Sequence, residues 1–446
     1  MDDAVTTAEA GSPLLQRILS LRSGRLWRGR DAQAKAKELL RLCEALLSER
    51  GEVSGARAAG ELIAAYRELD AAGRDAFFDL LTEAFLPDPA EAAKAADAYR
   101  ATPSPQTLLR LQAATESLRQ ELFRRLNLAA GGTGALIDMR RHLVATLRDH
   151  PERAALDADF VHLFRSWFNG GFLTLQRIDW RTSAVVLERL IQYEAVHQIQ
   201  GWDDLHRRLE ADRRCYAFFH PALPDEPLIF IEVALTERMS HAVRPLLDPR
   251  APVLDAARAR YAMFYSITHC QEGLRGVSFG SLLIKQVVED LQRHLPKIKT
   301  FATLSPIPDF RRWLGTSGVL PAHAALDEFL KKFDTRAVVL ADAVPAEVRQ
   351  ALVSLCAHYL VHARHGQVPY DSVARFHLAN GARLERINWL ADPSAIGIRR
   401  SFGLMANYLY RLEDLERNHE TYARDRRVIA ARAIEALAKQ RRPTRR

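Results

Sequence analysis

Residues 261–310 read YAMFYSITHC QEGLRGVSFG SLLIKQVVED LQRHLPKIKT FATLSPIPDF. The apolar run 261–268 predicts a β-strand, and the apolar positions from 281 to about 294 recur with helical spacing. A second strand is expected over 298–304, directly before Ser305. Strand, loop, helix and strand in this order predict a parallel crossover unit, and we expect the rest of the second domain to be built around it.

The loop between the first strand and the helix contains spaced glycines. Gly276 and Gly280 allow the backbone to approach a ligand closely. The free N–H groups at the start of the following helix, together with its positive dipole end, favour an anion at the same place. The loop therefore suits a pyrophosphate, although glycines before a helix also form plain turns, and spacing alone leaves both interpretations open.

Several blocks of sequence carry a resemblance to a known family. Arg275-Gly-Val-Ser-Phe-Gly280 is similar to the Arg/Gln-x-x-Gly-x-Gly/Ala loop of GNAT-type acyltransferases, except that Ser278 replaces the first glycine. The longer string from Gly276 to Val288, with Phe301-Ala-Thr-Leu-Ser-Pro-Ile-Pro308 after it, resembles malonyl-CoA decarboxylase. Further matching blocks are Phe376-His-Leu-Ala-Asn-Gly-Ala382, Asn388-Trp-Leu-Ala-Asp-Pro-Ser394 and Gly403-Leu-Met-Ala-Asn-Tyr408, so that the resemblance covers roughly Trp167 to Tyr410.

The resemblance implies a GNAT-like fold for the second domain and the conversion of malonyl-CoA to acetyl-CoA and carbon dioxide. It implies that His377 is the proton donor and that Ser305 is the second active-site residue. It also implies that the glycine loop holds the pyrophosphate of coenzyme A. The substrate-binding residues expected on this basis are Arg275, Gly276, Val277, Ser278, Phe279, Gly280, Ser281, Ser305, His377 and Tyr410.

The positions of the two expected catalytic residues fit these roles. His377 lies in the last turn of a helix predicted over 371–379, where the negative end of the helix dipole should raise its pKa. Ser305 follows a strand, and Pro306 holds its backbone extended. The chain has 15 histidines, of which most are expected to be structural, and a serine before proline often caps a turn. Position alone therefore leaves both roles open.

Decarboxylation of a malonyl thioester needs no metal in principle. The carboxylate must be held across the plane of the thioester carbonyl where solvation is poor, and an acid must then protonate the enolate carbon. We therefore predict no metal site and no cofactor besides the thioester substrate itself. His358, His362 and His365 have a spacing of i, i+4 and i+7 on a predicted helix, but a solvated helix face explains them more simply than a metal site.

The first part of the chain, from Ser12 to about Phe168, is expected to be helical throughout. Apolar residues from Leu108 to Leu126 recur at three- and four-residue steps, which predicts one helix that starts at Ser104-Pro105. Similar stripes occur over 32–47 and 60–85, and short loops between them favour an antiparallel bundle.

The predicted fold is α+β, with a helical bundle over 1–168 and a GNAT-like mixed-sheet catalytic domain over 169–446. Asn169-Gly-Gly171 marks the boundary. Within the second domain, adjacent strands are expected at 216–219 and 228–235, and helices at 183–197, 202–209, 345–364 and 371–379. The chain is expected to end in a basic tail, because residues 421–446 contain nine Lys or Arg and two Asp or Glu, a net charge of +7.

Composition excludes several classes of function. The net charge of +8 lies almost entirely in this tail, so no nucleic-acid partner is expected. No apolar run approaches the ~20 residues needed to span a membrane, and no secretory signal is recognisable. The four cysteines, Cys43, Cys215, Cys270 and Cys356, are far apart, which indicates buried thiols in a reducing compartment. We expect a cytoplasmic protein.

Two alternatives to a decarboxylase remain at this stage. The same fold and loop would serve an acyl-CoA-dependent acyltransferase, or a CoA-binding scaffold whose helical half makes the contacts. The expected small-molecule partner is malonyl-CoA. The helical half contains no visible site, so we expect it to form a homo-oligomer, either a dimer or a tetramer.

Overall fold

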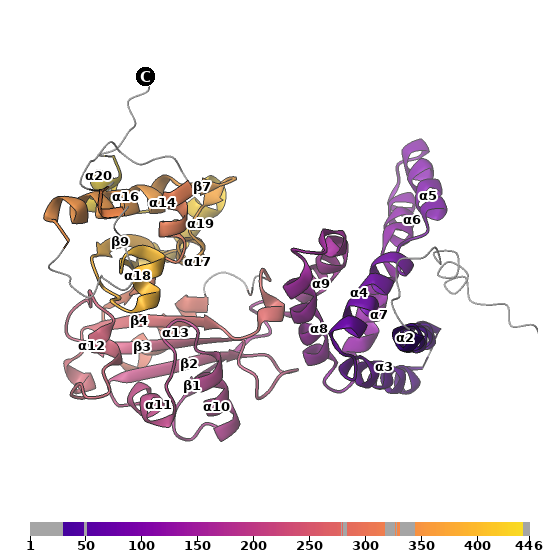
Figure 1. Cartoon of the computed structure of the whole chain (residues 1–446), viewed down its shortest axis with the longest axis horizontal. Coiled ribbons are helices and arrows are strands. Elements are labelled where there is room, and N and C mark those ends of the chain that lie inside the picture. The colour runs from indigo at the N-terminus through magenta and orange to yellow at the C-terminus, as the bar shows by residue number, and fades with distance from the viewer. Residues whose placement is uncertain are drawn as a thin grey trace, which may run out of the picture. The chain divides into compact units, whose positions relative to one another are not determined.

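The computed structural model describes residues 30–48, 51–277, 279, 283–316, 326, 328–330 and 344–439. The chain forms two compact units. The first comprises Met1–Phe172, Pro221–Leu223 and Gln271–Ser278, and the second comprises Leu173–His220, Pro224–Cys270 and Phe279–Arg446. The predicted order, a helical region followed by a mixed-sheet domain, is confirmed (Figure 1).

The first unit is helical. Its helices are α2 (Arg30–Ser48), α3 (Glu52–Arg67), α4 (Ala71–Ala84), α5 (Pro89–Ala101), α6 (Pro105–Thr115), α7 (Leu118–Asn127), α8 (Gly132–Thr146) and α9 (Ala154–Trp167), with the 3-10 turns η1 (Pro151–Arg153) and η3 (Glu272–Leu274). Side chains such as Leu62, Phe77, Leu122 and Leu136 are buried and form its core. Helices α5 and α6 contribute no buried residue and pack on each other.

The single helix predicted through Leu108 and Leu126 is wrong, because α6 and α7 are separate. Ser117 caps α7, since its hydroxyl oxygen accepts the N–H of Arg119 at 3.2 Å and the hydroxyl donates to the carbonyl of Phe85 at 3.2 Å. Leu126 is therefore buried while Leu108 is 39% exposed. The helix start predicted at Ser104-Pro105 is confirmed, because Ser104 is the N-cap of α6 and Pro105 is its first residue. The stripe over 60–85 is likewise divided, between α3 and α4.

The second unit is built on a mixed sheet. Its strands are β1 (Thr174–Ile178), β2 (Arg213–Phe219), β3 (Ile229–Thr236), β4 (Tyr261–His269), β5 (Thr300–Thr303), β6 (Ser305–Pro306), β9 (Arg383–Asn388) and β10 (Met405–Tyr410), while β7 (Arg364–His365) pairs only with β8 (Val368–Pro369). Strands β1 to β4 are antiparallel neighbours, β5 is parallel to β4, and β10 is antiparallel to β5, β6 and β9. The predicted pair of adjacent strands is β2 and β3.

The predicted crossover unit is confirmed, because α13 (Leu283–His294) connects the parallel strands β4 and β5. These strands pair as far as Phe264↔Thr303, and the N–H of Leu304 still reaches the carbonyl of Phe264 at 2.8 Å. Beyond this point β4 pairs with β3, whereas the other strand continues as β6 and pairs with β10. The two strands therefore separate next to Ser305.

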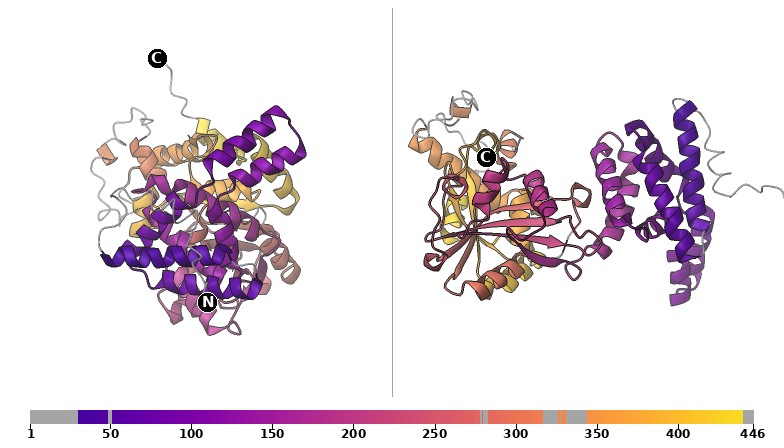
Figure 2. Two further views of the ribbon diagram at one scale, coloured as in Figure 1. Left: turned by 90° about the vertical axis from the view of Figure 1, so that its right-hand side faces the viewer. Right: turned by 90° about the horizontal axis from the view of Figure 1, so that it is seen from below.

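Helices lie on both faces of the sheet (Figure 2). Helices α10 (Ala184–Tyr193) and α11 (Trp202–Arg208) pack on the face that carries Cys215 and Phe230. Helix α13 lies on the opposite face, because its Asp290 accepts a hydrogen bond at 2.9 Å from Tyr216, which alternates with Cys215 along β2. The remaining helices are α12 (Arg244–Leu247), α14 (Phe310–Thr316), α16 (Ala346–His362), α17 (Ser372–Ala379), α18 (Ala395–Ser401), α19 (Leu412–Asp425) and α20 (Arg432–Lys439).

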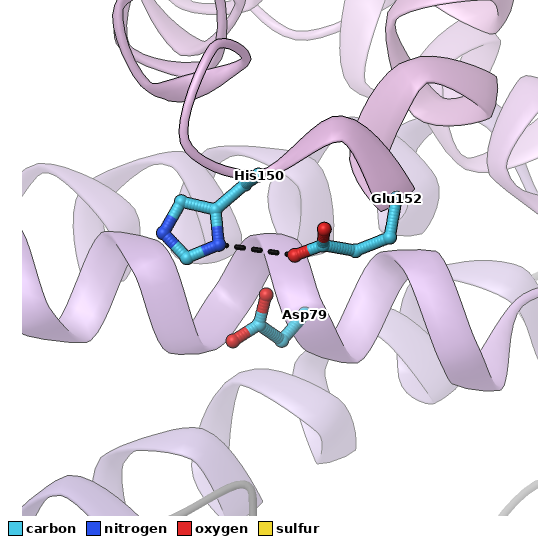
Figure 3. A group of neighbouring side chains, drawn as sticks. All are labelled: Asp79, His150 and Glu152. Carbon is cyan, nitrogen blue, oxygen red and sulfur yellow. Dashed lines mark hydrogen bonds and ion pairs between the residues drawn. The ribbon is translucent and has the colours of Figure 1, made fainter.

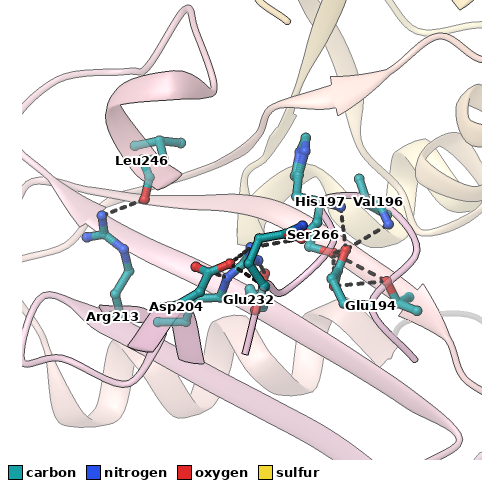
Figure 4. Close-up of polar contacts among 11 residues, drawn as sticks. Glu194, Val196, His197, Asp204, Arg213, Glu232, Leu246 and Ser266 are labelled. Carbon is teal, nitrogen blue, oxygen red and sulfur yellow. Dashed lines mark hydrogen bonds and ion pairs between the residues drawn. The ribbon is translucent and has the colours of Figure 1, made fainter. Parts of the chain in front are cut away.

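A buried polar network fixes the connection between α10 and α11 (Figure 4). The carboxylate of Glu194 accepts the N–H groups of Val196 and His197 at 2.7 and 2.6 Å, and also the hydroxyl of Ser266 at 2.8 Å. Burial is the main cause that raises the pKa of Glu194, and these hydrogen bonds oppose it. The helix predicted over 183–197 therefore ends at Tyr193, because the carboxylate takes the N–H groups that would have continued it.

The basic segment that was predicted to be a tail is folded as far as Lys439, where α20 ends. Helix α20 packs on α16 and buries Ile434 and Ala438. The N–H of Ala431 also donates to the carbonyl of Leu384 on β9 at 2.8 Å. Basic residues in this segment are thus held on a helix whose apolar side belongs to the core. The prediction took charge as the main signal and overlooked this apolar side.

The four cysteines are free and buried, as predicted. Among the described residues, no helix combines the length and apolar character that a membrane crossing requires.

Candidate active site

Helix α17 carries His377 in its last turn, as predicted. Asp371 caps the start of the helix, because its carboxylate accepts the N–H of Ala374 at 2.8 Å. The helix ends at Asn380, and Gly381 follows with a φ of +80°, a left-handed conformation that glycine adopts without strain. Both ends of this short helix are therefore fixed, and with them the position of the imidazole.

Two other predicted site residues, Ser305 and Tyr410, contact the imidazole of His377. His377 Nε2 lies 2.8 Å from Ser305 Oγ, and His377 Nδ1 lies 2.8 Å from the hydroxyl of Tyr410. His377 and Ser305 are only 2% and 5% exposed, and Tyr410 is fully buried. The ring of Tyr408 stacks on the imidazole with a centroid distance of 4.5 Å. Residues far apart in the sequence thus form one desolvated cluster.

The cluster lies on the face of the sheet opposite α10 and α11. Ala234, Ala302 and Leu304 pack together in the core on the α10 side. Thr303 and Ser305 alternate with these residues along the chain and therefore point to the other face. This is the face on which α13 lies.

The direction of the hydrogen bonds defines the tautomer of His377. The hydroxyl of Ser305 donates to Thr303 Oγ1 at 2.8 Å, so its single hydrogen is not available to the imidazole. Ser305 Oγ must then accept a hydrogen bond from His377 Nε2–H, and Tyr410 must donate its hydroxyl hydrogen to Nδ1. Burial raises the pKa of Tyr410 well above its ordinary value, which keeps this donor protonated.

The pKa predicted for His377 is wrong in direction. Burial of the imidazole lowers its pKa to about 3, because the charged form loses its solvation and no carboxylate compensates for the loss. The helix dipole on which the prediction relied acts most strongly at exposed or partly buried positions and is outweighed here. His377 is therefore a neutral imidazole at physiological pH.

The predicted phosphate loop is only partly described, because Ser278, Gly280 and Ser281 lie outside the described residues. Gly276 has a φ of +79° and open space where a Cβ atom would lie, which suits close approach by a ligand. Arg275 is exposed, whereas Val277 and Phe279 are buried. Val277 and Phe279 thus contribute to a core, so that among the described residues of the loop Arg275 and Gly276 are the exposed ones.

Arg140 of α8 anchors the start of this loop within the first unit. Its guanidinium donates to the carbonyls of Gly273 and Arg275 at 2.7 and 2.8 Å and pairs with Asp157 at 2.7 Å. A Cβ atom at Gly273 would lie 2.0 Å from the carbonyl oxygen of Ile137, so only glycine fits against α8 there. The predicted site did not include this anchor.

A cavity of about 420 Å³ lies elsewhere in the second unit. Pro306 and Met405 line it, and they alternate with Ser305 and Ala406, so it opens on the other face of the sheet from His377. Its charged lining residues include Asp204 and Arg208, which pair with each other at 3.1 Å. None of the predicted site residues that the structure describes lines this cavity.

One group of potential metal ligands occurs among the described residues, in the first unit (Figure 3). His150 Nδ1 lies 3.0 Å from a carboxylate oxygen of Glu152, and Asp79 lies beside them. Asp79 already accepts hydrogen bonds from Arg153 at 2.9 and 2.7 Å, and this positive charge opposes a cation there. The three histidines with metal-like spacing do not share a helix, since α16 ends at His362 and His365 lies in β7.

Sequence reasoning missed Thr303 and Tyr408. Thr303 Oγ1 accepts the hydroxyl of Ser305 and, at 3.1 Å, the N–H of Tyr408. Tyr408 covers one face of the imidazole. Both lie two residues from a predicted site residue on a strand, and residues at that spacing share a face of a sheet. Applied to the predicted strands, this alternation was a signal that could have found both residues.

Comparisons with known proteins agree over most of the chain. The family model for the malonyl-CoA decarboxylase C-terminal domain matches residues 171–446, and that for the N-terminal domain matches 85–168. Mitochondrial malonyl-CoA decarboxylase of Anser anser anser is 36% identical over 349 residues, which cover 72% of this chain and 69% of the relative. The mouse enzyme is 34% identical over 350 residues, which cover 72% of this chain and 70% of the relative.

Solved structures with similar folds carry the same name. A crystal structure of malonyl-CoA decarboxylase from Rhodopseudomonas palustris superposes with a TM-score of 0.85 and 48% identity, covering 90% of this chain and 99% of that chain. The corresponding structure from Agrobacterium vitis has a TM-score of 0.82 and 47% identity, with the same coverage.

Proposed function

The chain belongs to the malonyl-CoA decarboxylase family, and from that premise we propose how it converts malonyl-CoA to acetyl-CoA and carbon dioxide. The reacting groups are His377 and Ser305, with Tyr410 in support. The observation that carries this proposal is the chain of hydrogen bonds from Tyr410 through the imidazole to Ser305. These hydrogen bonds polarise the Nε2–H group of His377, which is buried.

The carbon–carbon bond to the carboxylate breaks first, and its electron pair moves into the thioester to form an enolate. A carboxylate held where solvation is poor loses carbon dioxide more readily, because the charge spreads in the transition state. Ser305 Oγ and His377 Nε2 provide polar groups within a buried cluster, where solvation is poor. We propose that the thioester oxygen or the α-carbon replaces Ser305 as the partner of the Nε2–H group.

The enolate then takes the Nε2 proton at its α-carbon, which yields acetyl-CoA. An enolate is a strong base, so a neutral imidazole suffices as the acid, just as neutral imidazoles serve as donors in other enzymes. Loss of this proton leaves His377 as an imidazolate anion, which Tyr410 stabilises by donating its hydroxyl hydrogen to Nδ1. One proton from solvent restores the starting state, so that one malonyl-CoA anion and one proton give acetyl-CoA and carbon dioxide.

We propose that the loop over 275–281 holds the pyrophosphate of coenzyme A, supported by the open space at Gly276 and by the basic side chain of Arg275. No metal and no further cofactor is needed for these steps. Product analysis with malonyl-CoA alone, before and after chelator treatment, tests this part. Loss of acetyl-CoA formation on chelation, restored by a metal, would contradict it.

Replacing His377 tests the proposed acid. H377N should lower kcat by about 10²- to 10⁴-fold, the usual contribution of general acid catalysis, while CoA affinity stays within about twofold. The matched control is H294N, which removes an exposed histidine from α13. Rates are measured by chromatographic quantification of acetyl-CoA, and CoA binding by calorimetry. Full activity in H377N would show that the acid is assigned wrongly.

We also propose a homo-oligomer that forms through the helical unit. Helix α6 supports this proposal. It buries none of its residues, and its Leu108 and Leu109 are 39% and 63% exposed. Apolar groups exposed together mark interaction surfaces. A cytoplasmic location likewise remains a proposal, supported by the four thiols, and the curated relatives are named mitochondrial.

A further inference from the structure

Thr303 occupies an unusual position behind the proposed catalytic pair. Its side chain is fully buried on β5 and does not touch His377, but its hydroxyl oxygen accepts the O–H of Ser305 at 2.8 Å. The same oxygen accepts the N–H of Tyr408 at 3.1 Å. Both lone pairs of the threonine oxygen are therefore occupied, and a hydroxyl in this state has no lone pair left for another donor.

The donor of the second bond stands next to a β-bulge. The pairing of β10 with β9 shifts register between Asn407 and Tyr408, because Asn407 faces Arg386 whereas Tyr408 faces Leu384, and the extra residue therefore lies in β9. Asn407 uses its side-chain amide to hold the carbonyl of Thr303, and Asn388 Nδ2 holds Asn407 Oδ1 at 2.8 Å. Thr303 is thus fixed through both its carbonyl and its hydroxyl oxygen.

We infer that Thr303 is a positioning residue for decarboxylation: by accepting the Ser305 hydroxyl, it holds His377 as the Nε2–H tautomer, with the transferable proton facing the substrate. Without this acceptor, the hydroxyl of Ser305 can turn and donate to Nε2. The imidazole would then carry its hydrogen on Nδ1 and point it at Tyr410, away from the reacting carbon. The inference rests on the proposed role of His377.

Three variants test it. T303V replaces the hydroxyl by a methyl group of similar shape, T303S restores the hydroxyl, and T268V removes a comparable buried hydroxyl from β4 that bonds to Glu194 instead. T303V should lower kcat for malonyl-CoA about 10- to 100-fold with KM within about twofold, because the acid loses its correct orientation. T303S and T268V should retain at least about half of the activity, and circular dichroism and thermal unfolding report whether each variant is folded.

The tautomer itself gives a readout that a purely structural role would not change. In ¹⁵N-histidine-labelled protein, the signals of His377 are identified by their loss in H377N, and protonated and bare ring nitrogens are distinguished by their chemical shifts. We expect Nε2–H in the unmodified protein and in T303S, and Nδ1–H in T303V. Nδ1–H in the unmodified protein would overturn the inference even if T303V did not fold.

The outcomes separate this inference from the proposed function. An inactive H377N with a fully active T303V would remove the role of Thr303 and leave the acid in place. An active H377N would remove the proposed acid, whatever the tautomer. An equal loss of kcat in T268V would also overturn the inference, because the effect would then belong to any buried hydroxyl of the sheet.

Discussion

His377 is neutral in the free enzyme, and this determines how the reaction should depend on pH. With its pKa lowered to about 3 by burial, the imidazole does not titrate between pH 5 and pH 8. We therefore expect kcat/KM, which reports the free enzyme, to show no acid limb with a midpoint near 6.5. The measurement should use malonyl-pantetheine, which lacks the phosphate that titrates near pH 6 in coenzyme A. A decrease of kcat/KM with a midpoint between pH 6 and 7 for this substrate would contradict the conclusion that His377 is neutral in the free enzyme.

The positions of His377 and Ser305 were easier to predict than the protonation state of His377. His377 and Ser305 stand at the end of a helix and at the end of a strand, and such local positions are visible in the sequence. The pKa of His377 depends on its burial, to which Tyr408 and Tyr410 of β10 and Ser305 contribute by contacting the imidazole. Desolvation of this kind arises only from tertiary packing, so a prediction based on the helix dipole gave the wrong direction.

Helix α17 has an ionisable cap with consequences for stability. Asp371 is fully buried, and burial raises its pKa from 3.8 to about 6, although the N–H of Ala374 and the hydroxyl of Tyr359 stabilise its charge. Because the folded-state pKa is higher than that of the unfolded chain, the contribution of Asp371 to stability is complete below pH 3.8. It is lost as the pH rises through about 6.

Replacing this cap by asparagine should flatten the pH dependence. D371N keeps an oxygen that caps the helix but cannot ionise. The free energy of unfolding of the wild type, relative to D371N, should fall by about 1 kcal/mol between pH 5 and pH 7. His377 acts in the opposite sense over an overlapping window, because its pKa is depressed, but it is present in both proteins and cancels in the difference. Urea denaturation at several pH values provides the measurement, and parallel curves for the two proteins would exclude this role for Asp371.

Elements were predicted best where the local signal was complete. The crossover β4–α13–β5 and the helix α17 carried their own start and stop signals in sequence. The division between α6 and α7 was missed because the apolar period continues across Ser117. The bonds of the Ser117 hydroxyl to the N–H of Arg119 and to the carbonyl of Phe85 mark the start of the new helix. Likewise, the end of α10 depends on the contact of Glu194 with Ser266, which lies far away in the sequence.

At the scale of the whole molecule, the distribution of apolar residues was a better guide to the fold than the distribution of charge. The basic end of the chain was predicted as a tail, yet α20 closes the core of the second unit with Ile434. In the first unit the reverse holds, because α5 and α6 bury nothing although α6 carries adjacent leucines. A pair of helices that exposes leucine and covers no core of its own is better explained by a partner surface than by the fold of the single chain.

Charge placed on this surface should therefore separate the subunits. The double variant L108E/L109E removes two apolar contacts from each chain, and losing the burial of two leucine side chains costs about 3 kcal/mol or more, so the dissociation constant should rise roughly 100-fold. Light scattering should give a mass that is a multiple of 50.3 kDa for the wild type and 50.3 kDa for the variant at low micromolar concentration. I396E, which alters a residue in the second unit that is 48% exposed, serves as the matched control and should remain assembled. A wild type that stays at the mass of one chain at every concentration would refute the assembly, and a variant that assembles like the wild type would place the contact elsewhere.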